Sequence, residues 1–123
     1  MKKENLEIGR KGEALAKKYL QKKGYRVIEQ NHRTKYSEID LIARHKGVLV
    51  FIEVRTKVGD QFGTPEESFN RKKINKLIWN AKAYITWKGY LKQCRIDAVC
   101  IVLDCNKTLK RINHYRNITW VKP

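Results

Sequence analysis

Residues 38–57 set charged side chains among strongly apolar ones. The segment reads EIDLIARHKGVLVFIEVRTK, and five of its charged positions are Glu38, Asp40, Glu53, Arg55 and Lys57. Carboxylates on neighbouring strands can bind a hard divalent cation, and they can equally form ion pairs with basic neighbours. The chemistry of the segment therefore depends on whether the fold brings its inner carboxylates together.

A two-residue turn at Lys46-Gly47 would decide this geometry, because glycine adopts the positive φ that such turns need. In that register the numbers of paired residues sum to 93, so Asp40 faces Glu53 and Glu38 faces Arg55. The other face pairs only apolar residues, namely Ile39 with Val54, Leu41 with Ile52 and Ala43 with Val50. A shift of one residue would turn the charges to the apolar side, which supports this register. A three-residue loop with a bulge stays open as an alternative.

Two carboxylates that face each other in this way repel unless a cation lies between them. Directly opposed side chains have Cβ atoms about 4.5–5.5 Å apart. Mg²⁺ binds oxygen ligands, so Asp40, Glu53, a backbone carbonyl and waters would suit it. A network of ion pairs with Arg55, Lys57 or Arg95 explains the same carboxylates equally well. The spacing alone does not separate a metal site from an ion-pair network.

The charge balance of the chain points to a polyanionic partner. Lys and Arg number 28 against 12 Asp and Glu, which gives a formal net charge of +16 over 123 residues. Such a surface binds nucleic acid through phosphate contacts, although a solvated basic surface or attraction to anionic lipid would need the same charge. The sequence has no apolar run of about 18 residues, and Cys94, Cys100 and Cys105 lack C-x-x-C spacing. We therefore expect one cytoplasmic domain, residues 1–123, with reduced and mostly buried cysteines and no membrane partner.

Hydrophobic periodicity predicts an α/β fold with a central mixed β-sheet flanked by helices. We expect one helix over residues 5–23, ending at Gly24, and a second from Glu66-Glu67 to about residue 87. Strands are expected over residues 25–31, 36–45, 48–57, 95–104 and 109–118. Because a helix separates the third and fourth strands, these two can be parallel, and the sheet is then mixed.

The second helix carries basic and aromatic side chains as well as an apolar stripe. The stripe consists of Ile74, Leu77, Ile78, Ala81 and Ile85. Basic side chains lie largely off this stripe, where they could contact a nucleic-acid backbone or simply be solvated. They are Arg71, Lys72, Lys73 and Lys76. Three aromatic residues could stack on unpaired bases, although aromatic side chains at this spacing more often pack in the core. They are Tyr36, Trp79 and Trp87.

A second group of polar residues receives a structural role or none. We expect Asp97 to pair with Arg95 or to cap a loop near the sheet edge. No role is predicted for His32, His45 and His114, which lack metal-ligand spacing.

Several longer motifs, taken in order, resemble one family of small bacterial proteins. They are GRKGEALAKKYLQKKGYRVIEQNHR, EIDLIA, FIEVRTK and RIDAV. Together they resemble the YraN family from residue 9 to about residue 115. Asp40 and the later Glu53-Val54-Arg55 are also similar to the Asp…Glu-x-Lys signature of the restriction-endonuclease-like PD-(D/E)xK nuclease superfamily.

This resemblance implies an αβββαβ core and phosphodiester hydrolysis with Mg²⁺ or Mn²⁺. Asp40 and Glu53 match the metal ligands, and Glu13 resembles the helix-borne Glu of archaeal Holliday-junction resolvases, which helps hold the metal. Lys57 could share the role of the motif lysine or contact phosphates. Glu38 could support a second ion, but we expect it to pair with the facing arginine. The expected target is structured DNA or RNA, with DNA preferred, and the analogy with junction resolvases suggests a homodimer.

Arg55 departs from the superfamily signature, which has lysine there. Arginine stays protonated, so it could stabilise phosphate charge without acting as a base. A non-catalytic nucleic-acid-binding module of the same fold, or a scaffold protein of a DNA-processing complex, therefore stands beside the endonuclease as an alternative. Ile39 replaces the proline of the signature, a change common in divergent members.

Overall fold

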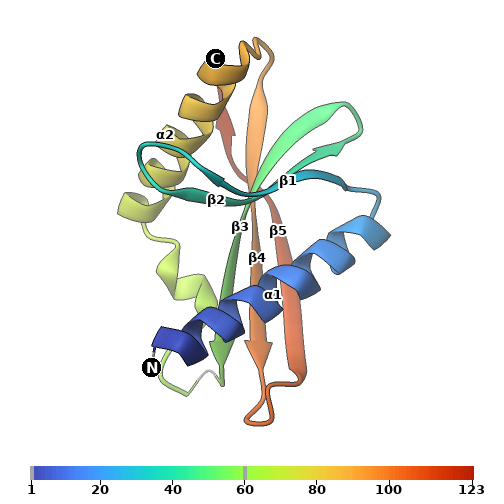
Figure 1. Ribbon diagram of the computed structural model, residues 1–123, viewed down its shortest axis with the longest axis vertical. Coiled ribbons are helices and arrows are strands. Elements are labelled where there is room, and N and C mark those ends of the chain that lie inside the picture. The colour runs from blue at the N-terminus through green and yellow to red at the C-terminus, as the bar shows by residue number, and fades with distance from the viewer. Residues whose placement is uncertain (1, 60) are drawn as a thin grey trace.

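Two helices pack against opposite faces of one five-stranded sheet (Figure 1). The computed structural model describes residues 2–59 and 61–123. Its elements are α1 (Lys2–Lys22), β1 (Arg26–Arg33), β2 (Glu38–His45), β3 (Val48–Val58), the 3-10 helix η1 (Pro65–Ser68), α2 (Arg71–Lys88), β4 (Cys94–Leu103) and β5 (Leu109–Val121). The strands follow the order β1-β2-β3-β4-β5, with β3 and β4 parallel and the other neighbours antiparallel. The predicted mixed sheet and αβββαβ core are confirmed.

The hairpin of β2 and β3 has the predicted register. Its paired residues run from His45–Val48 to Leu41–Ile52, and Asp40 and Glu53 follow directly after the last pair. Lys46 and Gly47 both have positive φ, at 50° and 80°, as a two-residue turn with the twist of a hairpin requires. Turn chemistry therefore fixes the pairing as far as Leu41 and Ile52.

The two faces of the sheet carry separate apolar clusters. On the α1 face, Ala16 and Leu20 of the helix pack with strand residues that include Leu41. On the α2 face, Leu77, Ala81 and Ile85 pack with strand residues such as Phe51 and Ile96. Among the described helices, none has an apolar stretch long enough to cross a membrane.

Ile39 departs from the predicted face. The prediction placed it beside Leu41, but it packs in the α2 cluster, whereas Leu41 belongs to the α1 cluster. Two residues spaced by two lie on one face of a regular strand, so β2 loses its alternation between these positions. The change occurs at Asp40, whose side chain consequently reaches the cleft beside α1.

The second helix begins later than predicted. Glu66 lies in η1, and Asn70 caps α2 by accepting a hydrogen bond of 2.9 Å from the Lys73 backbone amide. The buried side of α2 consists of Leu77, Asn80, Ala81, Tyr84 and Ile85. The predicted stripe is confirmed at Leu77, Ala81 and Ile85, and Ile78 packs partly buried against the same cluster, whereas Asn80 and Tyr84 were not predicted to lie on this side.

Candidate active site

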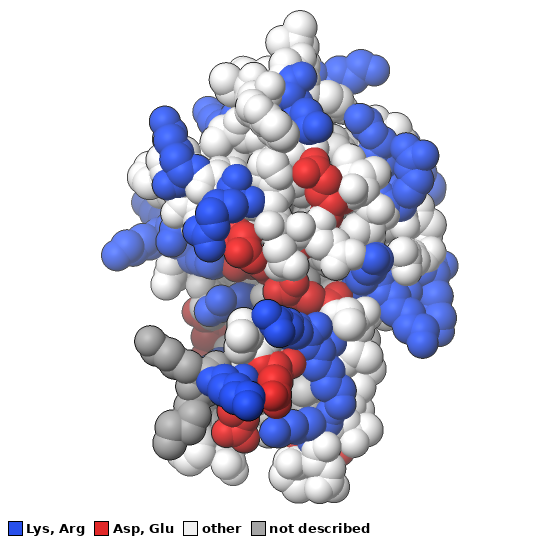
Figure 2. All heavy atoms as spheres, in the orientation of Figure 1, with Lys and Arg blue, Asp and Glu red and all other residues white. Residues whose placement is uncertain are grey.

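A cleft of about 470 Å³ lies between α1, β3 and η1. The predicted catalytic and metal-binding residues line it together: Glu13, Asp40, Glu53, Arg55 and Lys57. Figure 2 shows acidic side chains gathered on the face that carries α1, with Lys and Arg bordering them on both sides. The fold thus brings the residues of the proposed nuclease signature to one hollow on a basic protein.

Gly12 allows α1 to lie close enough to β3 for Glu13 to reach this cleft. A Cβ atom at Gly12 would lie 1.8 Å from Oγ1 of Thr56 and 2.8 Å from its Cβ. Both distances are too short for any side chain, so the helix can approach the strand only with glycine here. Gly12, the second glycine of the GRKGE motif, is therefore required for packing, and the close approach that it allows places the adjacent Glu13 at the cleft.

Asp40 and Glu53 form a close pair at the floor of the cleft. Oδ2 of Asp40 accepts a hydrogen bond of 2.8 Å from the Val54 amide, and Glu53 is only 6% exposed. Burial and, after it, repulsion by Glu53 raise the pKa of Asp40 from its ordinary value of 3.8 to about 8, although the hydrogen bond from the Val54 amide opposes the rise. Asp40 therefore holds its proton more tightly than an isolated carboxyl group does.

Lys73 places a cation against Glu53, a contact that the sequence did not predict. Its Nζ lies 2.9 Å from Oε2 of Glu53. The prediction grouped Lys73 with Arg71, Lys72 and Lys76 on an outer helix surface, and those three are exposed. Lys73 instead turns toward the sheet, because it shares the side of α2 that carries Leu77.

Asn31 is a second residue that sequence reasoning missed. Its Nδ2 donates hydrogen bonds of 2.8 Å to Glu13 and 3.0 Å to Glu38. Burial raises the pKa of Glu13, the Asn31 amide lowers it, and repulsion by Glu38 and Glu53 adds to the rise. The sequence offered one signal for this residue, an asparagine at the end of a predicted strand. Asn31 has a φ of 51°, which asparagine tolerates better than most residues.

The predicted pairing of Glu38 with Arg55 is wrong. Glu38 forms an ion pair of 3.4 Å with Arg33 on β1, and Nε of Arg55 donates to Oγ of Ser68 at 3.1 Å. The register that would oppose them ends at Leu41, so neither side chain is held in that position. Arg55 is exposed and anchored to η1, and Lys57 is exposed at the rim of the cleft.

The donor set of the cleft fits a hard divalent cation held partly by water. Within residues 2–59 and 61–123, no three His, Cys, Asp or Glu side chains are grouped closely enough to bind a metal by themselves. Mg²⁺ commonly uses one or two carboxylates and keeps several waters. Asp40 and Glu53 provide two such carboxylates, and the repulsion between them is what a cation would relieve.

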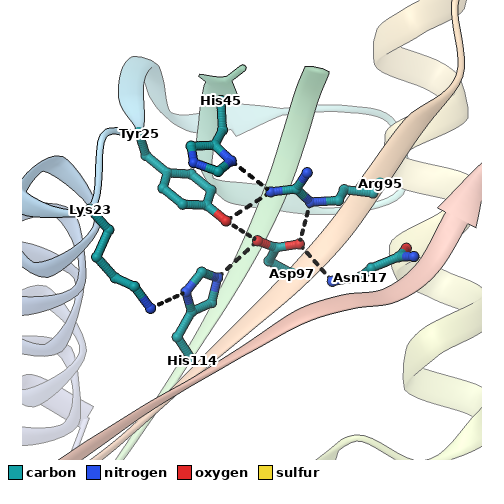
Figure 3. A network of polar contacts seen from close by, with 7 residues as sticks. All are labelled: Lys23, Tyr25, His45, Arg95, Asp97, His114 and Asn117. Carbon is teal, nitrogen blue, oxygen red and sulfur yellow. Dashed lines mark hydrogen bonds and ion pairs between the residues drawn. The ribbon is translucent and has the colours of Figure 1, made fainter. Parts of the chain in front are cut away.

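A separate polar network closes the α1 face of the sheet beyond the end of that helix (Figure 3). Arg95 donates from Nε to Asp97 at 3.0 Å, Tyr25 donates to the same carboxylate at 3.0 Å, and Nε2 of His114 lies 2.8 Å from it. The predicted pair of Arg95 and Asp97 is thus confirmed, and His114 and His45, to which no role was assigned, also contact it.

The network is structural because it is closed to solvent. Asp97 has 0% of its surface exposed. Burial acts to raise the pKa of Asp97, but hydrogen bonds from His114, the Asn117 amide and Arg95 outweigh it and hold the pKa below its ordinary value. A buried carboxylate that is ionised and fully hydrogen-bonded supports the fold and offers no access to a substrate.

Comparison with known proteins identifies the family. The chain matches the family described as "Uncharacterised protein family UPF0102" over residues 12–101. A UPF0102 protein of Caldanaerobacter subterraneus subsp. tengcongensis is 40% identical over 120 residues, which covers 95% of this chain and 98% of that relative. A UPF0102 protein of Pelotomaculum thermopropionicum is 37% identical over 111 residues, or 89% of this chain and 92% of the relative. These matches account for the motifs that resemble YraN. The chain belongs to the UPF0102 (YraN) family.

Proposed function

We propose that this protein is a metal-dependent endonuclease that hydrolyses phosphodiester bonds in structured nucleic acid, DNA in preference to RNA. The observation that carries the proposal is the convergence of Asp40 and Glu53 in a cleft that Glu13 also lines. The net charge of +16 supports a phosphate-bearing substrate. The free Cys94 and Cys100 fit a reducing compartment, so the proposed location is the cytoplasm.

In this mechanism Asp40 and Glu53 would hold Mg²⁺ or Mn²⁺, and Glu13 would support it through waters. A bound ion supplies an activated water and neutralises charge on the phosphoryl oxygens. Because Asp40 has a raised pKa, it must release a proton before it can bind a cation.

Basic side chains of the cleft would position the substrate. Lys73 orients Glu53 through its 2.9 Å ion pair and can donate to a phosphate oxygen from the same place. Arg55, fixed by Ser68, stays protonated and stabilises charge that develops on the phosphate. Lys57 at the rim contacts the backbone of the nucleic acid. Lys73 can therefore supply the ammonium group that the signature places at the position of Arg55.

A non-catalytic nucleic-acid-binding module is the second candidate. Two observations favour it: Arg55 replaces the lysine of the signature, and Lys73 already neutralises the charge of Glu53. In this case the cleft would bind phosphates without hydrolysing them. A scaffold role in a DNA-processing complex and a homodimer are compatible with either candidate, and sedimentation of the purified protein with and without DNA tests the dimer.

Cleavage of defined substrates tests the catalytic proposal. Branched, single-stranded and duplex DNA and RNA are incubated with the protein and Mg²⁺ or Mn²⁺, beside Asp40→Ala, Glu53→Ala and Lys73→Ala. The matched control is Glu7→Ala, which removes an exposed carboxylate of α1 outside the cleft. We expect each cleft variant to cut roughly a hundredfold more slowly or worse, while the control cuts normally. Tight binding without cleavage of any substrate would establish the binding module instead.

A further inference from the structure

A second groove lies on the α2 side of the molecule, away from the acidic cleft. It has a volume of about 630 Å³ and runs between the turn that joins β1 to β2 and the outer side of α2. Three large aromatic side chains line it and remain exposed: Tyr36 at 44%, Trp79 at 55% and Trp87 at 66%. The expectation that these aromatic residues belong to the core is therefore wrong. Exposed aromatic side chains that share one groove mark a binding surface.

A buried amide fixes the geometry of this groove. Asn80 is 1% exposed, and its side chain is hydrogen-bonded to the hydroxyl groups of Thr34 and Ser37 in the turn. The Thr34 hydroxyl also accepts from the Tyr36 amide at 3.1 Å. These contacts hold the turn against α2, so the ring of Tyr36 lies 6.1 Å from that of Trp79 before any ligand arrives. A ring held in place in advance loses little conformational entropy on binding.

The far end of the groove continues the aromatic surface. The ring of Trp87 lies 5.2 Å from that of His32 and is tilted by 34° to it. Tyr84 packs beside both rings, at 4.9 Å from His32 and 6.0 Å from Trp87. Exposed rings thus lie at both ends of the groove, Tyr36 and Trp79 at one and Trp87 at the other, while the buried Tyr84 packs against Trp87.

The charge of the groove identifies the kind of ligand. Its basic lining residues are Arg33, Lys35 and Lys82, and none of the described lining residues is acidic. Nζ of Lys35 lies 5.3 Å from the centre of the Tyr36 ring, and Nζ of Lys88 lies 4.8 Å from that of Trp87. Cations interleaved with exposed rings are the combination by which proteins bind single-stranded nucleic acid, with bases stacked on the rings and phosphates near the cations.

We propose that this groove binds the unpaired bases of a single-stranded segment of nucleic acid. A duplex keeps its base faces inside the stack, so it could use the lysines of the groove but not its rings. The proposal rests on the proposed function and specifies its substrate: a nucleic acid with an unpaired segment beside the bond to be cut. One helix links the two sites, since Trp79 follows Lys73 by six residues, a rise of about 9 Å along α2.

Binding measured without divalent metal tests this proposal independently of cleavage. A short labelled single strand and the blunt duplex of the same sequence are titrated in EDTA, with fluorescence anisotropy as the readout. The variants are Tyr36→Ala, Trp79→Ala and Trp79→Phe. The control is Trp120→Ala, an exposed indole on β5 outside the groove.

We expect Tyr36→Ala and Trp79→Ala to weaken single-strand binding by roughly 5- to 150-fold, the range measured when a stacking ring is removed. Duplex binding should stay unchanged, Trp79→Phe should retain most of the affinity, and Trp120→Ala should have no effect. Circular dichroism of each variant confirms that it is folded.

Two results would overturn the proposal: equal losses for the single strand and the duplex, or no loss for either. A change in sedimentation on Trp79→Ala, without a change in oligonucleotide affinity, would reveal a protein contact instead. Failure of the nuclease proposal is seen separately, because Asp40→Ala abolishes cleavage only if the cleft is catalytic and leaves binding in EDTA intact.

Discussion

Replacing Asp40 by asparagine should stabilise the protein at alkaline pH. The pKa of Asp40 is raised to about 8 by burial and by repulsion from Glu53. In the unfolded chain the carboxyl ionises near its ordinary value of 3.8. Because the folded state holds this proton more tightly, the contribution of Asp40 to stability is complete below about pH 4 and is lost as the pH rises through 8. Asparagine keeps the acceptor for the Val54 amide and never becomes charged.

The size of the effect follows from the interval between the two pKa values. At about 1.4 kcal/mol for each unit, the interval gives an upper bound of about 6 kcal/mol. Side-chain relaxation and entry of water reduce it, so we expect Asp40→Asn to raise the free energy of unfolding by about 2–4 kcal/mol near pH 9. Near pH 4 the two proteins should be almost equally stable.

Urea unfolding in EDTA from about pH 4 to pH 9 measures the difference. Glu7→Gln, at an exposed position on α1, is the control and should follow the wild type throughout. If the site also binds Mg²⁺, the ion should stabilise the wild type near pH 9 by about 2.7 kcal/mol at one hundred times its dissociation constant, and should have much less effect on Asp40→Asn. Parallel stability curves for the wild type and Asp40→Asn would show that the two carboxylates do not repel each other. The convergence on which the site depends would then be refuted.

Three further substitutions test other parts of the structure by urea unfolding. Hydrogen bonds from Arg111 lower the pKa of Glu66 to about 2, so its stabilisation is present above about pH 4.5 and is lost as the pH falls through 2. Glu66→Gln should therefore cost about 1–3 kcal/mol at neutral pH and much less near pH 2, and an equal cost at both pH values would contradict this. Gly12→Ala should cost about 1–3 kcal/mol and slow cleavage, because the new Cβ would clash with Thr56; wild-type stability would show that the helix approach is not tight. Asp97→Ala should cost about 3–5 kcal/mol by leaving a buried guanidinium unpaired, and a cost under about 1 kcal/mol would refute the ionised network.

The sequence predicts the hairpin well because local rules determine it. Turn chemistry at Lys46-Gly47 and the alternation of apolar residues specify one register from His45–Val48 to Leu41–Ile52. The same rules fail three residues later, where the prediction carried the register on to Glu38 and Arg55. There the strand loses its alternation, and the partners come from distant segments, namely β1 for Glu38 and η1 for Arg55. Long-range contacts of this kind leave no periodic signal in the sequence.

Two residues of α2 were assigned incorrectly because the apolar stripe marks only part of the buried side of the helix. Leu77, Ala81 and Ile85 of the stripe are buried, and Ile78 packs partly buried against the same cluster. The buried side also includes Asn80 and Tyr84, which hydrophobic spacing does not mark. Lys73 precedes Leu77 by one turn and therefore lies on that side, where it meets Glu53. Trp79 lies on the other side of the helix and is left exposed in the groove. The packing of α2 on the sheet thus directs Lys73 to Glu53 and leaves Trp79 in the groove, so the two proposed sites depend on the same orientation of one helix.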